Sequence, residues 1–445
     1  METHKQPTQD AHHDLLPRAG KLYADRAFVG LLATQFLGAF NDNVFKQTLL
    51  LMCLDYKKAQ QLPEDRFQPI ATALFTVAFL MFSGLAGYLS DKYRKRRIVV
   101  LSKVAEIVIM VVGLLVMLSF PPGSLALLWA LIGVLFVMGT QSAFFGPSKY
   151  GVLPEILHED DLPVANGWIQ MTTFLAIILG IVVAGKMKQQ VGGDLWMICV
   201  ACIVIACLGT LSSLFLRNPG AAQRELRFSP SCLAIEKNAW GLLQRDRPLL
   251  VTMIVYSMFW FVGGVILPTV NEVGKSQLGW NDEVTSNVNA CMAVGIGIGC
   301  LVAGNICRRS NALGLVRVGS AGLAAALCLA SVAAVFSPAA VNTYALGGTL
   351  LIAGIFGGIL AVPLQVFLQA RPPVELKGRT IGAMNLITWI GVLAAAAYYF
   401  LFNWAFSRSG IAPSWILATL AVVMLVVAFG YRTSGPTWHA PPRAP

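Results

Sequence analysis

The chain has 445 residues, of which 56% are apolar and only 12% are charged. About a quarter of the residues of an average soluble protein are charged, so the composition excludes an ordinary soluble enzyme, a secreted disulfide scaffold and a disordered chain. Twelve membrane spans of about 20 residues use about 240 apolar positions, which is close to 56% of this chain. An all-α integral membrane protein is therefore predicted, with too few remaining residues for a catalytic domain.

The apolar residues fall into twelve segments that are long enough to cross a membrane as helices. We predict twelve transmembrane helices in two six-helix bundles, because the longest polar connection separates the sixth segment from the seventh. The predicted spans are residues 27–54, 70–89, 98–119, 124–145, 164–186, 195–216, 249–273, 287–306, 314–336, 342–368, 380–405 and 413–431.

The long polar connection contains a stretch that is typical of a short amphipathic helix on a membrane surface. The two halves around it also repeat each other faintly, since Pro147 and Pro363 occupy similar places, as in the parallel repeats of transporters. The predicted parts are an N-terminal tail (1–26), a first bundle (27–216), a cytosolic linker (217–247), a second bundle (248–431) and a C-terminal tail (432–445).

The net charge of +11 fits either nucleic acid or an anionic membrane surface as a partner. The Lys and Arg residues lie in short segments between apolar runs, and this placement favours membrane lipids over nucleic acid. Counted on alternate sides of the predicted spans, 25 of the 33 Lys and Arg residues fall on the side of the N-terminus and 7 on the other side. The positive-inside rule then predicts that both termini are cytosolic. The polar, partly acidic N-terminal segment is accordingly predicted to be a cytosolic tail, not a signal peptide.

No metal or cofactor is expected. Cys199, Cys202 and Cys207 come nearest to a metal-binding spacing, but no histidine lies near them, so we interpret them as small hydrophobic side chains. The sequence has no glycine motif for a dinucleotide or for ATP. Any driving force for transport must then come from the gradient of the cargo or of an ion.

The most specific motif is GYLSDKYRKRR, residues 87–97, between the second and third predicted spans. Its glycine allows close helix packing, its aspartate can accept hydrogen bonds from helix N-terminal amides and arginines, and its basic run binds the inner leaflet. The motif resembles the signature loop of the major facilitator superfamily, with Arg94 in place of the usual inner glycine. The resemblance implies a conformational latch, and the alternative is a basic loop that only fixes topology. The predicted latch residues are Gly87, Asp91, Arg94, Arg96 and Arg97. The matching loop of the second half, residues 304–310, has no aspartate.

Polar residues inside the predicted spans are the candidates for binding a cargo. Gln35, Asp42 and Lys46 are spaced i, i+7 and i+11 in the first span and share one helix face. Asp42 and Lys46 also form an acid-to-base i,i+4 pair in the favourable order. An ionisable group at membrane depth costs at least a few kcal/mol unless it is paired or hydrated. Two interpretations stay open: Lys46 binds an anion while Asp42 is a gate or proton-linked group, or the two residues form an internal ion pair that only satisfies itself or ties helices together.

Further polar residues lie in the other spans. Pro147 is predicted to interrupt the fourth helix just before Lys149, which would lie beside exposed backbone groups. The alternative is a lysine that extends to the inner interface. Glu106, in the middle of the third span, has no partner that the sequence assigns, and Lys103, one turn away, is only a candidate. The remaining candidate substrate contacts are Asn166, Gln170, Gln365 and Asn385. Residues of these types more often form polar contacts between helices.

Four segments show a resemblance to one branch of the superfamily. Through these segments the chain is similar to the lysophospholipid transporters of the major facilitator superfamily over nearly the whole helical region. The segments are QFLGAFNDNVFK (35–46), GPSKYGVLPE (146–155), VANGW (164–168) and GGILAVPLQVFLQ (357–369).

The resemblance implies a monomeric protein that flips lysophospholipids from the outer to the inner leaflet of the bacterial inner membrane by alternating access. The flipped lipid would supply a lysophospholipid acyltransferase, a functional partner, for reacylation. Asp42 and Lys149 match family positions thought to be functional polar contacts. Some members carry an arginine where this chain has Leu267 and Pro268, and Lys46 is the expected replacement cation.

Other functions stay open beside this one. The same scaffold could be a proton-coupled efflux pump for amphiphilic compounds, driven through Asp42, or a non-transporting membrane partner that recruits an acyltransferase. An enzyme is not expected, because acyltransferases of that group carry H-x4-D and none of the five histidines has an aspartate five residues on.

Overall fold

The computed structural model describes residues 22, 24–61, 66–217, 220, 222–309, 314–337 and 341–431. Regular structure in these residues is helical throughout, and twelve of the helices have 16 residues or more. These twelve correspond one to one to the twelve predicted spans. Most of the predicted N-terminal tail, the whole predicted C-terminal tail, and Ser310 of the second-half loop lie outside the described residues.

The long helices divide into six before the linker and six after it. The first six are α2 (Arg26–Ala59), α3 (Phe67–Lys92), α4 (Lys95–Ser119), α5 (Leu125–Ile156), α6 (Leu162–Val191) and α7 (Trp196–Ser213). The second six are α9 (Arg247–Glu272), α10 (Asp282–Arg309), α11 (Gly314–Phe336), α12 (Asn342–Ala370), α13 (Lys377–Arg408) and α14 (Trp415–Gly430).

The linker between the two sets contains the expected short amphipathic helix, α8 (Lys237–Arg245). Ala239 and Leu243 are buried on one side of α8, whereas Lys237, Trp240 and Arg245 are exposed. Asp246 ends α8 and begins α9, because its carboxylate accepts a hydrogen bond from the backbone amide of Leu249 at 3.2 Å.

Ten of the described helices are long and apolar enough to cross a membrane. Helix α14 is shorter, with 16 residues. Helix α2 is long enough, but its Asn, Asp and Gln residues lower its hydropathy. Helix α2, the first of the twelve long helices, is therefore unusually polar for a membrane span, which is the property expected of a helix that contributes to a site.

Helix α4 shows which faces of these helices point outward and which point toward the other helices. Its exposed side carries Leu101, Val108 and Leu115, seven residues apart and each more than half exposed. Its opposite side buries Lys103 and Glu106. Apolar side chains thus face outward, where lipid tails lie, and the charged side chains face the other helices, as expected for membrane helices.

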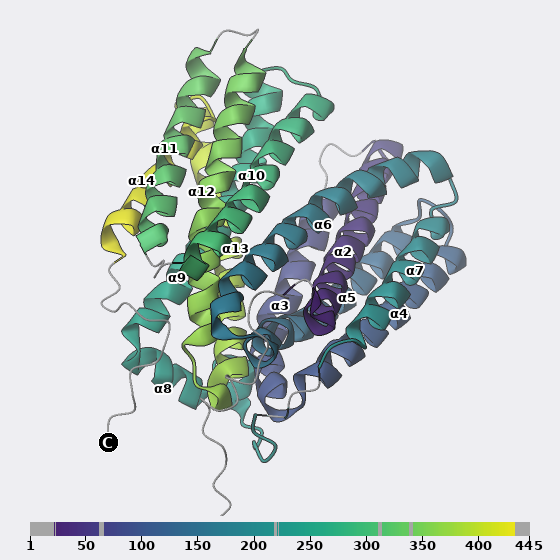
Figure 1. The fold of residues 1–445 in the computed structure, drawn as a ribbon. Coiled ribbons are helices and arrows are strands. Elements are labelled where there is room, and N and C mark those ends of the chain that lie inside the picture. Colours follow the sequence, from purple (N-terminus) through teal and green to yellow (C-terminus); the bar gives the residue numbers. More distant parts are fainter. Residues whose placement is uncertain are drawn as a thin grey trace, which may run out of the picture.

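The two sets of helices form two bundles that meet at one end and diverge at the other (Figure 1). The main contacts between the bundles are α3 with α13 and α6 with α10. Helices α2 to α7 lie on the right of the view, and α9 to α14 on the left. A pair of six-helix bundles of this kind is the predicted fold.

Small residues bring the two bundles into backbone contact at their shared end. A Cβ on Gly87 of α3 would lie 2.7 Å from the carbonyl oxygen of Gly378 on α13. A Cβ on Gly167 of α6 would lie 2.6 Å from the carbonyl oxygen of Cys300 on α10. Both contacts leave no room for a side chain. This end carries the loops that the Lys and Arg residues predict to be cytosolic, and the bundles are closed together there.

The predicted break at Pro147 is wrong. Helix α5 continues through Pro147 and Pro154 to Ile156, and the ANG sequence at 165–167, whose composition is typical of a turn, lies inside α6. A proline inside a helix removes one backbone hydrogen bond and costs about 3 kcal/mol. Both prolines are buried, so packing against neighbouring helices offsets the cost and the helix stays continuous.

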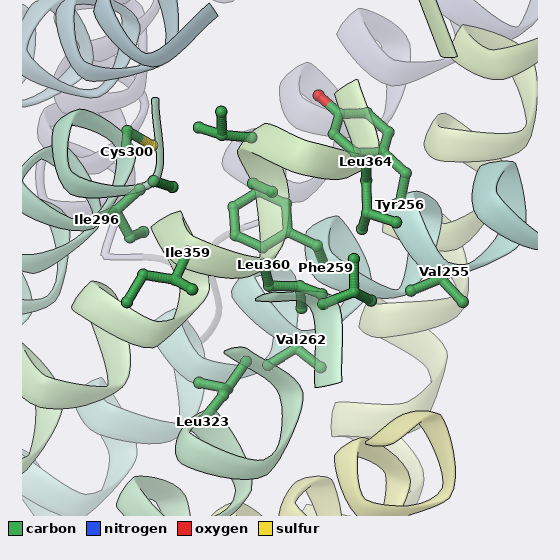
Figure 2. Close-up of a cluster of buried hydrophobic side chains, with 14 of the residues drawn as sticks. Val255, Tyr256, Phe259, Val262, Ile296, Cys300, Leu323, Ile359, Leu360 and Leu364 are labelled. Atoms are coloured by element: carbon green, nitrogen blue, oxygen red, sulfur yellow. The ribbon is translucent and has the colours of Figure 1, made fainter. Parts of the chain in front are cut away.

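The second bundle has a dense apolar core. Tyr256 and Phe259 of α9 pack with Ile296 of α10, Leu323 of α11 and Leu360 of α12 (Figure 2). Each of these side chains is less than a tenth exposed. Rigid packing of this kind supports movement of the bundle as a unit, because a close-packed core resists internal deformation.

Candidate functional site

The polar face of α2 contacts three other helices of the first bundle. Gln35 Nε2 donates to Thr173 Oγ1 on α6 at 3.0 Å, and Asp42 Oδ2 accepts from Ser142 Oγ on α5 at 2.7 Å. The amine of Lys46 lies 5.0 Å from the ring centre of Phe75 on α3. Asp42 and Lys46 are both half-buried, so the first helix presents them to the interior without sealing them.

The ion pair within α2, one of the two open interpretations, does not form. No nitrogen–oxygen distance between Asp42 and Lys46 is within 4.0 Å, and the two side chains turn to Ser142 and Phe75 instead. An i,i+4 pair stabilises a helix by only about 0.2–0.5 kcal/mol. Contacts with neighbouring helices therefore outweigh it, and the interpretation of a pair that only satisfies itself is not the arrangement seen.

Lys149 of α5 is the second amine of this region. It is 9% exposed, and its nitrogen lies 4.4 Å from the ring centre of Tyr150 and 5.6 Å from that of Phe145. Among the described residues, neither Lys149 nor Lys46 has a hydrogen-bond or ion-pair partner. Neither amine belongs to the sealed side-chain atoms without a partner, so both nitrogens reach accessible space.

Asp42 is close enough to Lys46 and to Lys149 for their charges to interact. Its Oδ1 atom is buried and has no partner in the described part of the chain. Two amines and one carboxylate thus share a region inside the first bundle. Ammonium groups in a partly desolvated setting are suited to an anionic group such as a phosphate.

A charged pair that the sequence only hinted at lies beside this region. Lys103 Nζ is 2.5 Å from Glu106 Oε2 on the same helix, α4, and Asn41 Nδ2 of α2 donates to Glu106 Oε1 at 2.8 Å. Glu106 thus pairs with Lys103, the candidate one turn away. Asn41 was missed, although its position beside Asp42 within the first span was a signal.

Three of the other predicted substrate contacts bind protein groups across the bundle interface or along it. Asn166 of α6 and Gln369 of α12 form two mutual amide hydrogen bonds, each 2.9 Å long. Gln170 Nε2 of α6 donates to the Tyr256 hydroxyl of α9 at 3.2 Å. Asn385 of α13 packs against α5, where a Cβ on Gly146 would lie 2.8 Å from its Nδ2 atom. These residues connect the two bundles in this state.

Gln365 of α12 differs from these residues. Its side chain is 0% exposed, and neither its amide nitrogen nor its amide oxygen has a partner among the described residues. A buried amide without hydrogen bonds costs about 1–3 kcal/mol for each unmet group. Its helix, α12, contacts helices of both bundles.

The predicted latch aspartate binds the opposite bundle. Asp91 Oδ1 accepts from the backbone amide of Gly378 at 2.6 Å, and Oδ2 accepts from the backbone amide and Nε of Arg379, both at 3.0 Å. Asp91 thereby caps the N-terminus of α13. Arg379 also donates to Glu236 at 2.9 Å and to Gln223 at 2.8 Å, both in the linker. The sequence did not single out Arg379, which stands at the start of the eleventh span.

The basic residues of the motif do not join this contact. Arg94 and Arg97 are exposed, and Arg96 donates to the backbone oxygen of Leu214 at the end of α7, at 2.9 Å. Lys95, between them, is buried and lies 2.5 Å from Glu155 of α5. Gly87 and Asp91 alone of the five predicted latch residues reach the other bundle.

The described residues contain no group of three or more His, Cys, Asp or Glu side chains that could hold a metal ion. The site instead offers amines, one carboxylate, hydroxyls and aromatic rings.

Two six-helix bundles joined by a linker and packed together at one end form a secondary transporter of the major facilitator type. The sequence model of the Major Facilitator Superfamily matches residues 31–396. The chain therefore belongs to that superfamily and is a multi-pass membrane protein.

Within the superfamily, the chain belongs to the family of the lysophospholipid transporter LplT. The Lysophospholipid transporter LplT of Serratia proteamaculans (strain 568) is 30% identical over 367 residues, which cover 81% of this chain and 84% of that protein. The protein of the same name from Photorhabdus laumondii subsp. laumondii is 28% identical over 383 residues, 84% of this chain and 88% of that protein.

Solved structures are similar in fold. A bacterial homologue of the iron transporter ferroportin in its outward-facing state has a TM-score of 0.69 at 14% identity, covering 91% of this chain and 98% of that one. The transporter FucP in the outward conformation has a TM-score of 0.68 at 14% identity, covering 91% and 99%. At this identity the likeness concerns the fold alone.

Proposed function

We propose that this protein flips lysophospholipids from the outer to the inner leaflet of the bacterial inner membrane by alternating access. The observation that carries the proposal is the pair of amines, Lys46 and Lys149, that share an interior region with Asp42 and hold no partner among the described residues. The names of the LplT relatives support a lysolipid as cargo.

The chemistry of a lysolipid matches such a site. Its charged head cannot cross hydrocarbon, whereas its single acyl tail need not leave it. Lys46 and Lys149 attract the phosphate, and Asp42 keeps the region from becoming strongly positive. Lys46 is the cation that stands in for the arginine that some family members carry near the position of Leu267.

Alternating access then requires the closed end to open. In the state described, Asp91 holds the start of α13, and Asn166 holds Gln369 across the bundles. We propose that these contacts form a latch that breaks when the bundles rock apart on the cytosolic side. Head-group release to the inner leaflet follows from that movement.

The remaining expectations belong to the same proposal. The protein acts as a monomer with both termini in the cytosol, and the residues 27–216 and 248–431 move as the two domains. The flipped lysolipid is consumed by an acyltransferase that restores the second acyl chain.

Reconstitution tests the proposal. The protein is placed in vesicles with a fluorescent lysophosphatidylglycerol in the outer leaflet, and its arrival in the inner leaflet is measured by loss of accessibility to a quencher. We expect protein-dependent flipping that varies with the head group. Proton-driven export of an amphiphilic dye with no lysolipid movement would favour the efflux pump. Unchanged acyltransferase activity in cells carrying Asp42→Asn or Lys46→Met would favour a recruiting partner.

A further inference from the structure

A buried ion pair lies beside the proposed head-group site and takes no direct part in it. Lys103 and Glu106 are 2% and 1% exposed, and their charged groups are 2.5 Å apart. Glu106 uses its other oxygen to accept from Asn41 Nδ2 at 2.8 Å. Each carboxylate oxygen therefore has one partner, a lysine on its own helix and an asparagine on the helix that carries Asp42.

The pair packs directly on α2. A Cβ on Gly38 would overlap the amine of Lys103 and would lie 3.8 Å from Glu106 Oε2. Gly38, Asn41 and Asp42 fall within about one helical turn. The contact therefore fixes the rotation of α2 at the level where Asp42 and Lys46 face the interior.

The pair also affects the charge of the site. Lys103 and Lys149 lie over the same ring, that of Phe145, with nitrogens 5.0 Å and 5.6 Å from its centre. Asp42 is near enough to Glu106, Lys103 and Lys149 for their charges to act on it. Glu106 cancels the charge of Lys103, which leaves Lys46 and Lys149 against Asp42. Counted by formal charge, the two lysines then exceed Asp42 by one.

We propose that Glu106 and Lys103 set the head-group preference of the transporter, by orienting α2 and by limiting the excess positive charge to one. This inference rests on the proposed function. A phosphoglycerol head carries one negative charge and matches that excess, whereas a phosphoethanolamine head is zwitterionic. Glu106 is a positioning residue, since it acts through Lys103 and Asn41 and need not touch the lipid.

The test measures a ratio, not a rate. Initial flipping of lysophosphatidylglycerol is divided by that of lysophosphatidylethanolamine in the same vesicles. Glu106→Gln leaves a third uncancelled lysine and is expected to raise the ratio about tenfold, because a unit charge within about 8 Å has an effect of at least this size in a partly buried site. Lys103→Met leaves an uncancelled glutamate and is expected to lower the ratio by a similar factor. The double variant is expected to keep the ratio within about twofold.

A matched control is available at the contact between α4 and α5. Glu155→Gln breaks the buried Lys95–Glu155 pair between α4 and α5, near the closed end, and is expected to leave the ratio unchanged. Shifts of the two single variants in the same direction, or no shift, would overturn the proposal. It is also overturned if neither single variant reaches the membrane while the double variant folds with the original ratio, since the pair then only stabilises the fold. If the unmodified protein moves neither lipid, the proposed function itself fails.

Discussion

Two lysines in the interior of a membrane protein need a physical reason. Lys46 and Lys149 each lie over an aromatic ring, at 5.0 Å and 4.4 Å from the ring centre. Such contacts contribute about 0.5–2 kcal/mol, less than the several kcal/mol that a charge within a membrane can cost. Access to water and the charge of Asp42 supply the rest. The amines are thus held in a state that an anion would stabilise further.

We predict that Lys46→Met and Lys149→Met each reduce flipping of a lysolipid with an anionic head about tenfold. A hydrogen bond to a charged group contributes about 1.5–3 kcal/mol, and Met keeps most of the side-chain volume. Flipping per molecule and the amount of folded protein in the membrane are measured together. The control is Lys188→Met, which breaks the Lys188–Asp55 pair at the end of the first bundle that lies away from the closed end. It is expected to change neither the flipping per molecule nor the amount of folded protein by more than about twofold. An equal loss of flipping and of folded protein in the site variants would favour a structural role.

The helices of the second bundle pack by faces of small residues. Gly295 and Gly299 of α10 lie against the backbone of Leu351 and Ile355 of α12, with no space for a Cβ. Gly354 and Gly358 of α12 face α10 in the same way. Close approach of this kind increases van der Waals contact between helices that have no hydrophobic driving force in lipid.

We predict that Gly299→Ala destabilises the protein by about 1–3 kcal/mol, because its methyl group would overlap the carbonyl of Ile355 and force the helices apart. The measurement is the Tm of the purified protein in detergent. Gly348→Ala, on the exposed side of α12 with no atom within 4 Å of a new Cβ, is the matched control. It is expected to leave the Tm unchanged or raise it, since Ala favours a helix over Gly by about 1 kcal/mol. Equal effects of both variants would contradict packing at the α10–α12 contact.

At the scale of the whole molecule, the linker ties the closed end together. Arg379 of α13 binds Asp91 of α3 together with Glu236 and Gln223 of the linker. The Tyr88 hydroxyl donates to the backbone oxygen of Leu226 at 3.1 Å. A Cβ on Gly84 would overlap the linker backbone around Cys232 to Ala234. The linker is therefore part of the contact between the bundles, and separation of the bundles must disturb it.

We predict that Asp91→Asn makes Cys232 about tenfold more reactive toward a maleimide. The variant removes the charge that strengthens three hydrogen bonds, a loss of about 1–2 kcal/mol, which corresponds to about a tenfold shift toward open states. Cys232 belongs to the linker and is 2% exposed, and Cys199, in the first bundle, is the internal reference. Modification is measured for each cysteine by mass spectrometry.

Asp55→Asn is the control for that experiment, because it breaks an ion pair at the opposite end of the first bundle. It should leave Cys232 protected. A rise in Cys199 reactivity equal to that of Cys232 would indicate general unfolding and would contradict an opening confined to the closed end.

Much of this architecture was predictable from the order of residue types along the chain. The twelve spans, the short amphipathic helix of the linker and the Lys103–Glu106 pair all depend on neighbours within a few turns. Hydropathy and helical spacing act at that range, so the prediction needed no knowledge of the packing. The polar face of α2 was predictable for the same reason.

The partners across the molecule were not predictable in this way. Asp91 and Arg379 are 288 positions apart, and Asn166 and Gln369 are 203 positions apart. An Asp42–Lys46 pair was one of two open interpretations, but the two side chains contact Ser142 and Phe75 instead. Helix α5 was expected to break at Pro147, but it continues through this buried proline. Local spacing decides which residues share a helix face. The arrangement of the helices decides what that face meets, because contact energies between helices exceed the small energies of neighbouring side chains on one helix.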